Sequence, residues 1–423
     1  MEHVLIMTRA WVLHPDIKSD RGRRTSEPAL AEAVSLAGAL ANIEVCGNEI
    51  VSLPKIRAGT MFGSGKIQEL KAKFAEHDVE LVLINGSVTP VQQRNLEKEW
   101  NVKLLDRTGL ILEIFSDRAA TREGVLQVEM AALSYQRTRL VRAWTHLERQ
   151  RGGLGFVGGP GETQIEADRR AIDDQLVRLR RQLDKVVKTR ALHRASRAKV
   201  PYPIVALVGY TNAGKSTLFN RLTGADVMVK DMLFATLDPT MRAVNLDNGL
   251  DIILSDTVGF ISDLPTELVA AFRATLEEVL AADVILHVRD ISHEVTEDQA
   301  HDVRMILDGL GVRKQIAQLE VWNKIDQMRA ENAEAMRSRA ARDDGVLTLS
   351  ALTGEGVDEL LQVLDKTLRD ASHKSQLSLT FAQGKQRAWL FAQDLIETET
   401  QSDGGFELSV TWTAKQEKQF NAL

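Results

Sequence analysis

The stretch GYTNAGKS, Gly209 to Ser216, decides the fold of this chain. It satisfies the phosphate-loop pattern G-x-x-x-x-G-K-[ST], follows the apolar run IVALV (204–208) and opens a helical stretch. Glycine lets backbone amides close around phosphate oxygens, and the N-terminus of the following helix adds its positive pole. This context predicts a nucleotide site on a doubly wound, mainly parallel sheet, with Lys215 reaching the β- and γ-phosphates and Ser216 binding Mg²⁺.

Two motifs downstream are typical of a switch that senses the third phosphate. DTVG, Asp256 to Gly259, ends a strand-like run about forty residues after the phosphate loop. Asp256 is expected to bind Mg²⁺ through water, and the Gly259 amide to meet the γ-phosphate. Between them lies FATLDPT (234–240), where Thr236 is favoured over Thr240 as the second hydroxyl on Mg²⁺. The predicted catalytic residues are Lys215, Thr236 and Gly259.

Two later motifs select the base. In NKID, Asn323 to Asp326, the final carboxylate can accept hydrogen bonds from guanine N1–H and its amino group, whereas adenine would leave that charge unpaired. SAL, Ser350 to Leu352, ends the following strand in the right order to offer a backbone amide to the base. The residues predicted to bind the nucleotide are Gly209, Tyr210, Thr211, Asn212, Ala213, Gly214, Lys215, Ser216, Thr217, Phe234, Ala235, Thr236, Leu237, Asp238, Asp256, Thr257, Val258, Gly259, Asn323, Lys324, Ile325, Asp326, Ser350, Ala351 and Leu352.

The rest of the chain divides into three further segments. Short apolar runs, VLIM (4–7), IEV (43–45), LVLI (81–84) and VKLL (102–105), alternate with helical stretches and predict a small α/β domain. LSLTF, a helical 385–396 and FELSVTW predict a small βαβ-like domain at the end. The predicted domains are an N-terminal α/β domain over 1–117, a helical hairpin over 118–199, a P-loop G domain over 200–370 and a C-terminal α/β domain over 371–423.

The hairpin is predicted from two amphipathic patterns around a glycine-rich stretch. Apolar residues recur at helical spacing on both sides of RGGLGFVGGPGETQ, 151–164, which is expected to form a flexible tip. Residues 118–199 hold eighteen Lys/Arg against nine Asp/Glu, although the whole chain has a net charge of −6. This asymmetry indicates either a surface for a polyanion or a solvated helical face. The candidate RNA-binding residues are Arg151, Gly152, Gly153, Gly158, Gly159, Arg169, Arg170, Arg178 and Arg181.

With these motifs in order, the whole chain resembles the HflX family of translational GTPases. GGPGETQIEADRR, 158–170, is similar to that family's glycine-rich signature and stands before the phosphate loop, FATLDPT and DTVGF. The family more often reads GxRGPGET, whereas Phe156 and Val157 precede two glycines here, so a basic contact is missing from the tip. The resemblance implies binding of GTP and GDP and of the large (50S) ribosomal subunit with its rRNA. It also implies separation of stalled or idle 70S ribosomes under stress in the GTP state, with release on hydrolysis.

Phe260 stands where many such enzymes carry a glutamine that orients the attacking water. A phenyl ring cannot hydrogen-bond water, and the resemblance implies that it turns away from the nucleotide. We therefore expect slow intrinsic hydrolysis that the ribosome accelerates. Asn212 is either a K⁺ ligand beside the phosphates or a residue that tolerates the tight loop geometry.

Three alternatives stay open at this point. AGTMFGSGK (58–66) suggests a second phosphate loop and ATP as an additional substrate, but Thr60 replaces its first glycine and Ile67 its Ser/Thr, so a turn entering a helix is favoured. An RNA-binding assembly factor could use GTP only as a timer, and a signalling switch could bind a protein effector. The latter makes little use of a basic hairpin.

Composition bounds the remaining questions. Apolar residues make up 44% and charged residues 26% of the chain, as in globular proteins. The single cysteine, Cys46, cannot form an internal disulfide, which fits a reducing compartment. VLIM is too short for a signal peptide or membrane span, so a cytoplasmic location is expected. No feature of the sequence fixes an oligomer, and a monomer is the default expectation.

Overall fold

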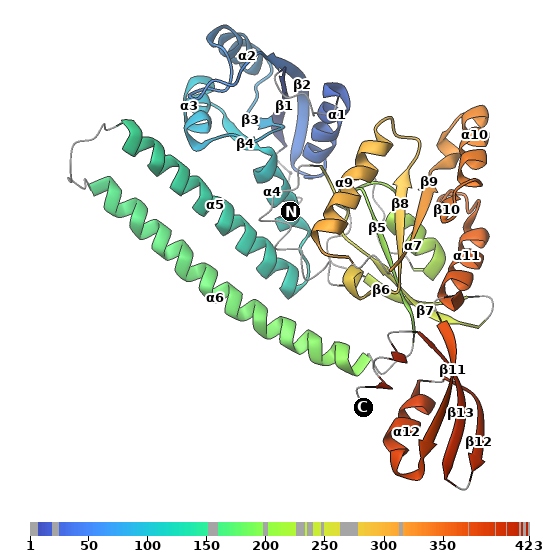
Figure 1. Cartoon of the computed structure of the whole chain (residues 1–423). Helices are drawn as coiled ribbons and strands as arrows, with labels where there is room; N and C mark the ends of the chain where they lie inside the picture. The colour runs from blue at the N-terminus through green and yellow to red at the C-terminus, as the bar shows by residue number, and fades with distance from the viewer. Residues whose placement is uncertain are drawn as a thin grey trace, which may run out of the picture.

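The computed structural model describes residues 7–18, 25–150, 160–197, 202–225, 233–234, 240–246, 249–262, 278–312, 316–370, 372–393, 395–402, 404–413, 416–417 and 420–421, with backbone only at 140–150, 160–165, 189–197, 370, 372–373 and 413. Figure 1 shows the four predicted bodies in chain order, from the blue N-terminal domain to the red C-terminal domain. They confirm the predicted α/β class with a central P-loop domain, a helical hairpin and a small final domain.

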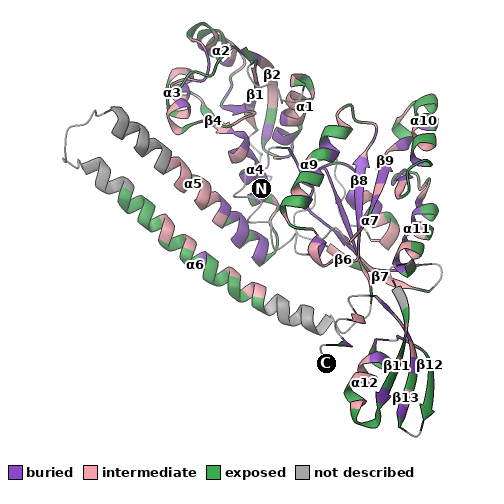
Figure 2. Ribbon diagram, viewed as in Figure 1, coloured by how far each residue is buried: buried purple, intermediate pink, exposed green. Residues whose placement is uncertain are grey.

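The N-terminal domain is a four-stranded parallel sheet with strand order β2-β1-β3-β4. Its first strand begins at Thr8, just after the predicted VLIM run, of which only Met7 lies within the described residues. Parallel strands covered by helices are buried, and Figure 2 shows purple along β1, whereas the outer strand β2 is mostly half-buried. The elements are β1 Thr8–Ile17, α1 Ser26–Ala37, β2 Ile43–Leu53, α2 Ser64–Glu76, β3 Leu81–Ile84, α3 Pro90–Trp100, β4 Lys103–Asp106 and α4 Arg107–Arg118.

The hairpin consists of α5 (Arg122–Gln150) and α6 (Pro160–Arg197), which lie side by side in Figure 1. An ion pair between Arg137 Nε and Asp173, 2.7 Å long, links the two helices. The second helix starts at Pro160, inside the predicted tip 151–164, because proline suits the first helical position, where its missing N–H costs nothing. In the described part of the chain, no helix is both long and apolar enough to cross a membrane.

The G domain holds a six-stranded sheet in the order β10-β9-β8-β5-β7-β6. Five strands are parallel, and β6 runs antiparallel to β7 at the edge. No apolar run in the sequence marks β6, which buries a single side chain, Val244. The elements are β5 Ile204–Gly209, α7 Lys215–Thr223, β6 Thr240–Asn245, β7 Asp251–Asp256, β8 Val284–Asp290, α9 Thr296–Gly309, β9 Ala317–Asn323, η1 Ile325–Gln327, α10 Ala330–Ala340, β10 Val346–Thr348 and α11 Val357–Asp370.

The C-terminal domain is an antiparallel three-stranded sheet, β11-β13-β12, with one α-helix packed on it. The predicted helix 385–396 ends at Ala392, and the residues after it form an additional strand that returns through a turn at Gly405. The elements are β11 Ser372–Thr380, η2 Phe381–Gln383, α12 Gly384–Ala392, β12 Ile396–Ser402 and β13 Gly405–Thr413.

Candidate nucleotide-binding site

The predicted motifs meet at one edge of the G-domain sheet. The phosphate loop follows β5, DTVG follows β7, NKID begins at the end of β9, and SAL follows β10. Parallel strands carry their carboxyl ends to the same edge, where doubly wound folds bind ligands. Segments more than a hundred residues apart in the chain thus come into direct contact, since Asn323 donates a hydrogen bond to the Ala213 carbonyl.

The phosphate loop is so tightly packed that two of its glycines are required. Gly214 has φ +93°, and a Cβ there would lie 2.2 Å from Nδ2 of Asn323. A Cβ on Gly209 would lie 2.1 Å from the Val288 carbonyl oxygen of β8. Asn212 adopts φ +59°, a left-handed conformation that asparagine tolerates better than most residues. The loop therefore has the tight backbone that a phosphate cradle needs.

Lys215 is buried at the base of this loop, with 5% of its surface exposed. Its ammonium donates hydrogen bonds to the carbonyl oxygens of Gly209 (3.2 Å) and Tyr210 (2.9 Å). Burial lowers the pKa of Lys215 to about 8, while the negative charge of Asp256 acts in the opposite direction. A buried cation held by neutral carbonyls is well placed to attract an anion.

Ser216 and Asp256 form the other polar pair of the loop. The Ser216 hydroxyl donates to Oδ2 of Asp256 at 2.7 Å, and the carboxylate is fully buried at the end of β7. A hydroxyl and a carboxylate are hard oxygen donors of the kind that Mg²⁺ takes from proteins when it keeps waters and substrate phosphates. Among the described residues there is no cluster of three or more His, Cys, Asp or Glu that could hold a metal ion.

Asn323 connects the phosphate loop to the SAL segment. Its Nδ2 donates to the Ala213 carbonyl at 2.8 Å, and its Oδ1 accepts from the Ala351 amide at 2.9 Å. Lys324 has φ +65° and pairs with Asp290 at 2.8 Å, and Asp326 lies exposed in η1. The NKID motif predicts Asn323 in the site, but no local pattern in the sequence indicates that it joins the two loops.

Phe260 is turned into the core. Its ring is 1% exposed within an apolar cluster that contains residues of the N-terminal domain, α5 and the G domain. Its backbone pairs with the phosphate loop instead: the Phe260 amide donates to Gly209 O at 3.0 Å, and Thr211 donates to Phe260 O at 2.7 Å. The side chain thus packs, while the main chain of this segment faces the phosphate loop.

Several predicted residues lie elsewhere or outside the described part of the chain. Thr236, with Ala235, Leu237 and Asp238, lies outside the described residues, as does the tip with Arg151, Gly152, Gly153, Gly158 and Gly159. Phe234 is buried and stacks edge-to-face on Phe115 of α4, with ring centroids 4.5 Å apart. Thr240, the alternative metal ligand, begins β6 opposite Asp256. The helix α6 presents exposed arginines at Arg169, Arg170, Arg178 and Arg181.

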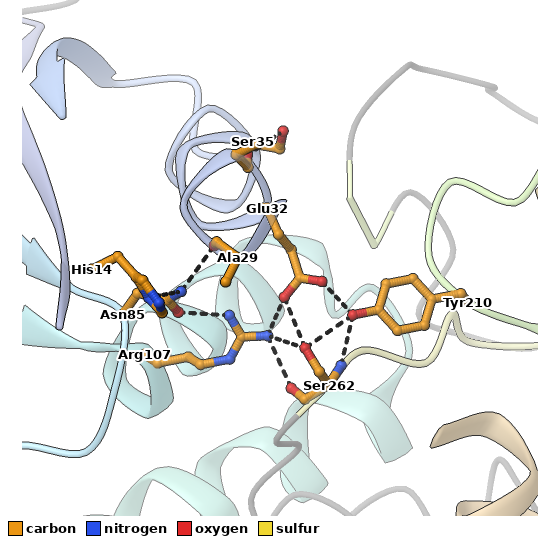
Figure 3. A network of polar contacts seen from close by, with 9 residues as sticks. His14, Ala29, Glu32, Ser35, Asn85, Arg107, Tyr210 and Ser262 are labelled. Atoms are coloured by element: carbon orange, nitrogen blue, oxygen red, sulfur yellow. Dashed lines mark hydrogen bonds and ion pairs between the residues drawn. The ribbon is translucent and has the colours of Figure 1, made fainter. Parts of the chain in front are cut away.

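A polar network that the sequence does not predict joins the phosphate loop to the N-terminal domain (Figure 3). The Tyr210 hydroxyl donates to Glu32 of α1, and the Ser262 amide donates to that hydroxyl at 2.9 Å. Arg107, at the start of α4, pairs with Glu32 and donates to the Ser262 carbonyl at 2.9 Å. No sequence pattern relates residues so far apart in the chain, so only the structure reveals this contact.

The second glycine-rich segment is bound into the N-terminal domain. Lys66, in the first turn of α2, pairs with Glu49 and, at 2.8 Å, with Glu69. These ion pairs and their hydrogen bonds raise the pKa of Lys66, although desolvation acts against them. The lysine that a second phosphate loop would need is thus already engaged by carboxylates.

Family models cover almost the whole described chain. The N-terminal part matches "GTP-binding GTPase N-terminal" over residues 27–116 and "GTP-binding GTPase Middle Region" over 118–197. The remainder matches "50S ribosome-binding GTPase" over 204–324 and "HflX C-terminal domain" over 335–422. The last match begins well before the C-terminal sheet, in α10 of the G domain.

Curated relatives are similar over most of their length. A protein of Magnetococcus marinus named GTPase HflX is 50% identical over 378 residues, which is 89% of this chain and 85% of the relative. The Escherichia coli protein of that name is 42% identical over 382 residues, covering 89% and 87%. A putative GTP-binding protein 6 of Xenopus laevis is 34% identical over 399 residues, covering 92% and 74%.

Proposed function

Because this chain belongs to the HflX family of GTPases, it hydrolyses GTP, and we propose that it binds the large ribosomal subunit and separates 70S ribosomes when GTP is bound. Hydrolysis then releases it. The single observation that best supports a nucleotide-driven function is the convergence of the four motifs on one sheet edge, where Asn323 hydrogen-bonds to both the phosphate loop and SAL.

We propose these roles within the site. The amides of Thr211 to Thr217 and the ammonium of Lys215 bind the phosphates, Asp326 recognises the guanine edge, and the amide of Gly259 meets the γ-phosphate. GTPases with a phosphate loop generally use Mg²⁺, and here Ser216 and Thr236 would hold it, with Asp256 acting through water. When bound, Mg²⁺ neutralises charge on the phosphates.

Slow intrinsic hydrolysis follows from the buried Phe260 ring. With 1% of its surface exposed it offers the attacking water nothing, so orientation depends on main-chain groups of the DTVG segment and on groups supplied by the ribosome. A partner that completes such a site raises the rate by roughly 10³- to 10⁵-fold in other GTPases. Ribosomal stimulation is therefore part of the proposal.

The exposed face of α6 is the proposed rRNA contact. Figure 2 shows green, exposed residues along most of its described length. Arg169 forms an ion pair with Asp173 at 4.0 Å, and Arg170 forms one with Glu166 at 3.7 Å. Both pairs are long and solvent-exposed, so each contributes little stability. Arg178 bonds only weakly along its own helix, to the Asp174 carbonyl at 3.3 Å, so phosphate oxygens can compete for these guanidinium groups.

The test combines hydrolysis with binding. Wild-type protein should hydrolyse GTP much faster with purified 50S subunits than without them, and should pellet with 50S when loaded with a non-hydrolysable GTP analogue. Charge reversal at Arg178 and Arg181 to Glu should weaken pelleting, whereas the same reversal at exposed Arg329 and Arg342 of the G domain should not. Equal turnover with and without subunits would contradict the proposal.

Two narrower points belong to this function. K⁺ bound at Asn212 would supply positive charge beside the phosphates. The left-handed φ of +59° is by itself a sufficient reason for asparagine at this position. Equal rates of GTP hydrolysis in KCl and NaCl at matched ionic strength would exclude a K⁺ ligand there. ATP remains the alternative substrate. The ion pairs of Lys66 with Glu49 and Glu69 argue against an ATP site on the second glycine-rich segment. A ribosomal target implies a cytoplasmic protein.

A further inference from the structure

Arg221 lies on the helix that begins in the phosphate loop but reaches across to the SAL loop. It stands near the end of α7, six residues after Lys215. Its Nε donates to the Ala351 carbonyl at 2.6 Å, and its Nη2 donates to the Leu352 carbonyl. A guanidinium usually donates its parallel hydrogen bonds to a carboxylate, whereas here it donates to two successive peptide carbonyls.

The SAL loop is shaped around this guanidinium. Gly354 has φ +96°, and a Cβ there would lie 2.6 Å from Nη1 of Arg221. The backbone conformation favours glycine at this position, and a side chain there would also have to displace the Arg221 guanidinium. This is a second observation, independent of the hydrogen bonds, that the loop and the arginine fit together.

Burial alone does not fix this loop. Leu352, at its centre, is 68% exposed. The turn closes on itself through bonds from Gly354 N to Ser350 O (2.8 Å) and from Thr353 N to Ser350 Oγ (3.0 Å). Ala351 packs in the apolar cluster that includes Ala213 and Leu218. Two polar ties, through Asn323 and Arg221, also join the loop to the phosphate loop and to α7. Removing one of these two ties should leave the exposed turn free to shift.

Because the peptide group is planar, the hydrogen bond from Arg221 to the Ala351 carbonyl also determines where the next backbone N–H points. The Ala351 carbonyl and the Leu352 N–H belong to one planar peptide group, and the described chain contains no cis peptide bond. In a trans peptide the two groups point in opposite directions, so a carbonyl held by Arg221 fixes the direction of the Leu352 N–H. The Ala351 N–H is already given to Asn323, which leaves the Leu352 amide as the next donor of SAL.

We infer that Arg221 is a positioning residue for guanine recognition: by holding the Ala351 and Leu352 carbonyls, it aims the Leu352 amide at the O6 acceptor of the base. The inference rests on the proposed guanine site and adds a residue to it. Arg221 does not touch the nucleotide. Its effect is to hold the Leu352 N–H, which lies in an exposed loop, in a fixed position relative to Asn323 and Asp326.

The experiment compares GDP with 6-thio-GDP, which keeps the N1–H and amino groups but replaces O6 by a weaker acceptor. Wild-type protein should prefer GDP. Arg221→Ala should lose about tenfold in GDP affinity, as for one good hydrogen bond, and should lose most of the preference over 6-thio-GDP. Arg221→Lys, which keeps one donor group at that position, should fall between them. Arg342→Ala, an exposed arginine of the same domain, serves as the control.

Each other outcome is decisive. GDP affinity within twofold of wild type in Arg221→Ala, or an equal loss for both nucleotides at unchanged thermal stability, would overturn the inference while leaving the guanine site in place. Wild-type protein that bound ADP as tightly as GDP would overturn the guanine site itself, and this inference with it.

Discussion

The Tyr210 hydroxyl of the phosphate loop donates a hydrogen bond to Glu32 of the N-terminal domain, and so joins the nucleotide site to a domain more than 170 residues away in the chain. Ser262, three residues after Gly259, lies in the same network and bonds to both Tyr210 and Arg107. The edge-to-face stack of Phe234 on Phe115 adds a second contact between the G domain and α4. Groups on both sides of the predicted γ-phosphate position thus touch the N-terminal domain.

The first prediction concerns the charge pair inside this network. Arg107 and Glu32 expose only 7% and 14% of their side chains. Arg107→Ala leaves the Glu32 carboxylate buried without its cation, which should cost about 3 kcal/mol. Thermal unfolding should then begin at least about 5 °C lower. Arg94→Ala, at an exposed site on α3, is the matched control, and identical midpoints for the two variants would refute the role given to the pair.

A second prediction follows from the buried ring of Phe260. Phe260→Gln should not speed intrinsic GTP hydrolysis, because the side chain points into the apolar cluster and not at the phosphate loop. It should lower stability, since a buried amide without partners costs roughly 1–3 kcal/mol in addition to the lost packing. Phe260→Leu, which stays apolar, should be milder. A glutamine variant with a faster intrinsic rate would show that the side chain reaches the water.

The pKa of Lys215, lowered to about 8 by burial, predicts how binding depends on pH. Below pH 8 the lysine is charged in both the folded and the unfolded chain, so the full cost of burying the charge is present. As pH rises from 8 towards 10.5, only the unfolded chain keeps the proton, so the free protein becomes more stable. Phosphates need the charged form, and binding above pH 8 must therefore take up a proton.

The corresponding measurement is calorimetry of GDP binding at pH 7 and pH 9 in buffers of different ionisation enthalpy. Affinity should fall about tenfold between these values, with nearly one proton taken up at pH 9 and almost none at pH 7. Binding at pH 9 without proton uptake would mean that the lysine remains charged in the free protein.

A fourth prediction concerns the metal. Ser216→Ala removes the hydroxyl that lies 2.7 Å from Asp256 and should make GTP binding respond far less to added Mg²⁺, while binding in EDTA changes little. Thr217→Ala, the next hydroxyl along α7, is the control. The readout is the affinity for a non-hydrolysable GTP analogue across a Mg²⁺ titration. An unchanged Mg²⁺ response in Ser216→Ala would remove Ser216 from the metal site.

The parts of the fold that the sequence predicted are those with a local signal. Strand β5 is a continuous apolar run, β8 opens with three apolar residues, and the phosphate loop stands in the strand–loop–helix context that its pattern requires. Two edge strands carry no such signal: β12 is largely exposed and β6 buries a single side chain, so neither alternation nor a run of apolar residues marks them.

What the sequence could not predict depends on long-range packing. Glu32 and Arg107 are ordinary helix residues in one dimension, and their partners Tyr210 and Ser262 belong to another domain. In the sequence, Arg221 is an ordinary charged residue of a predicted helix, and only the structure shows that it donates hydrogen bonds to the SAL carbonyls. Such contacts are set by how domains and loops pack, which no local pattern encodes.

The most direct test of the proposed function is a sucrose-gradient profile of 70S ribosomes incubated with this protein and a non-hydrolysable GTP analogue. The account predicts a shift of 70S particles into free 30S and 50S subunits, absent with GDP and absent with Lys215→Ala. A 70S peak that stays unchanged, while the protein still binds GTP and the 50S subunit, would contradict it and favour a GTP-timed assembly factor.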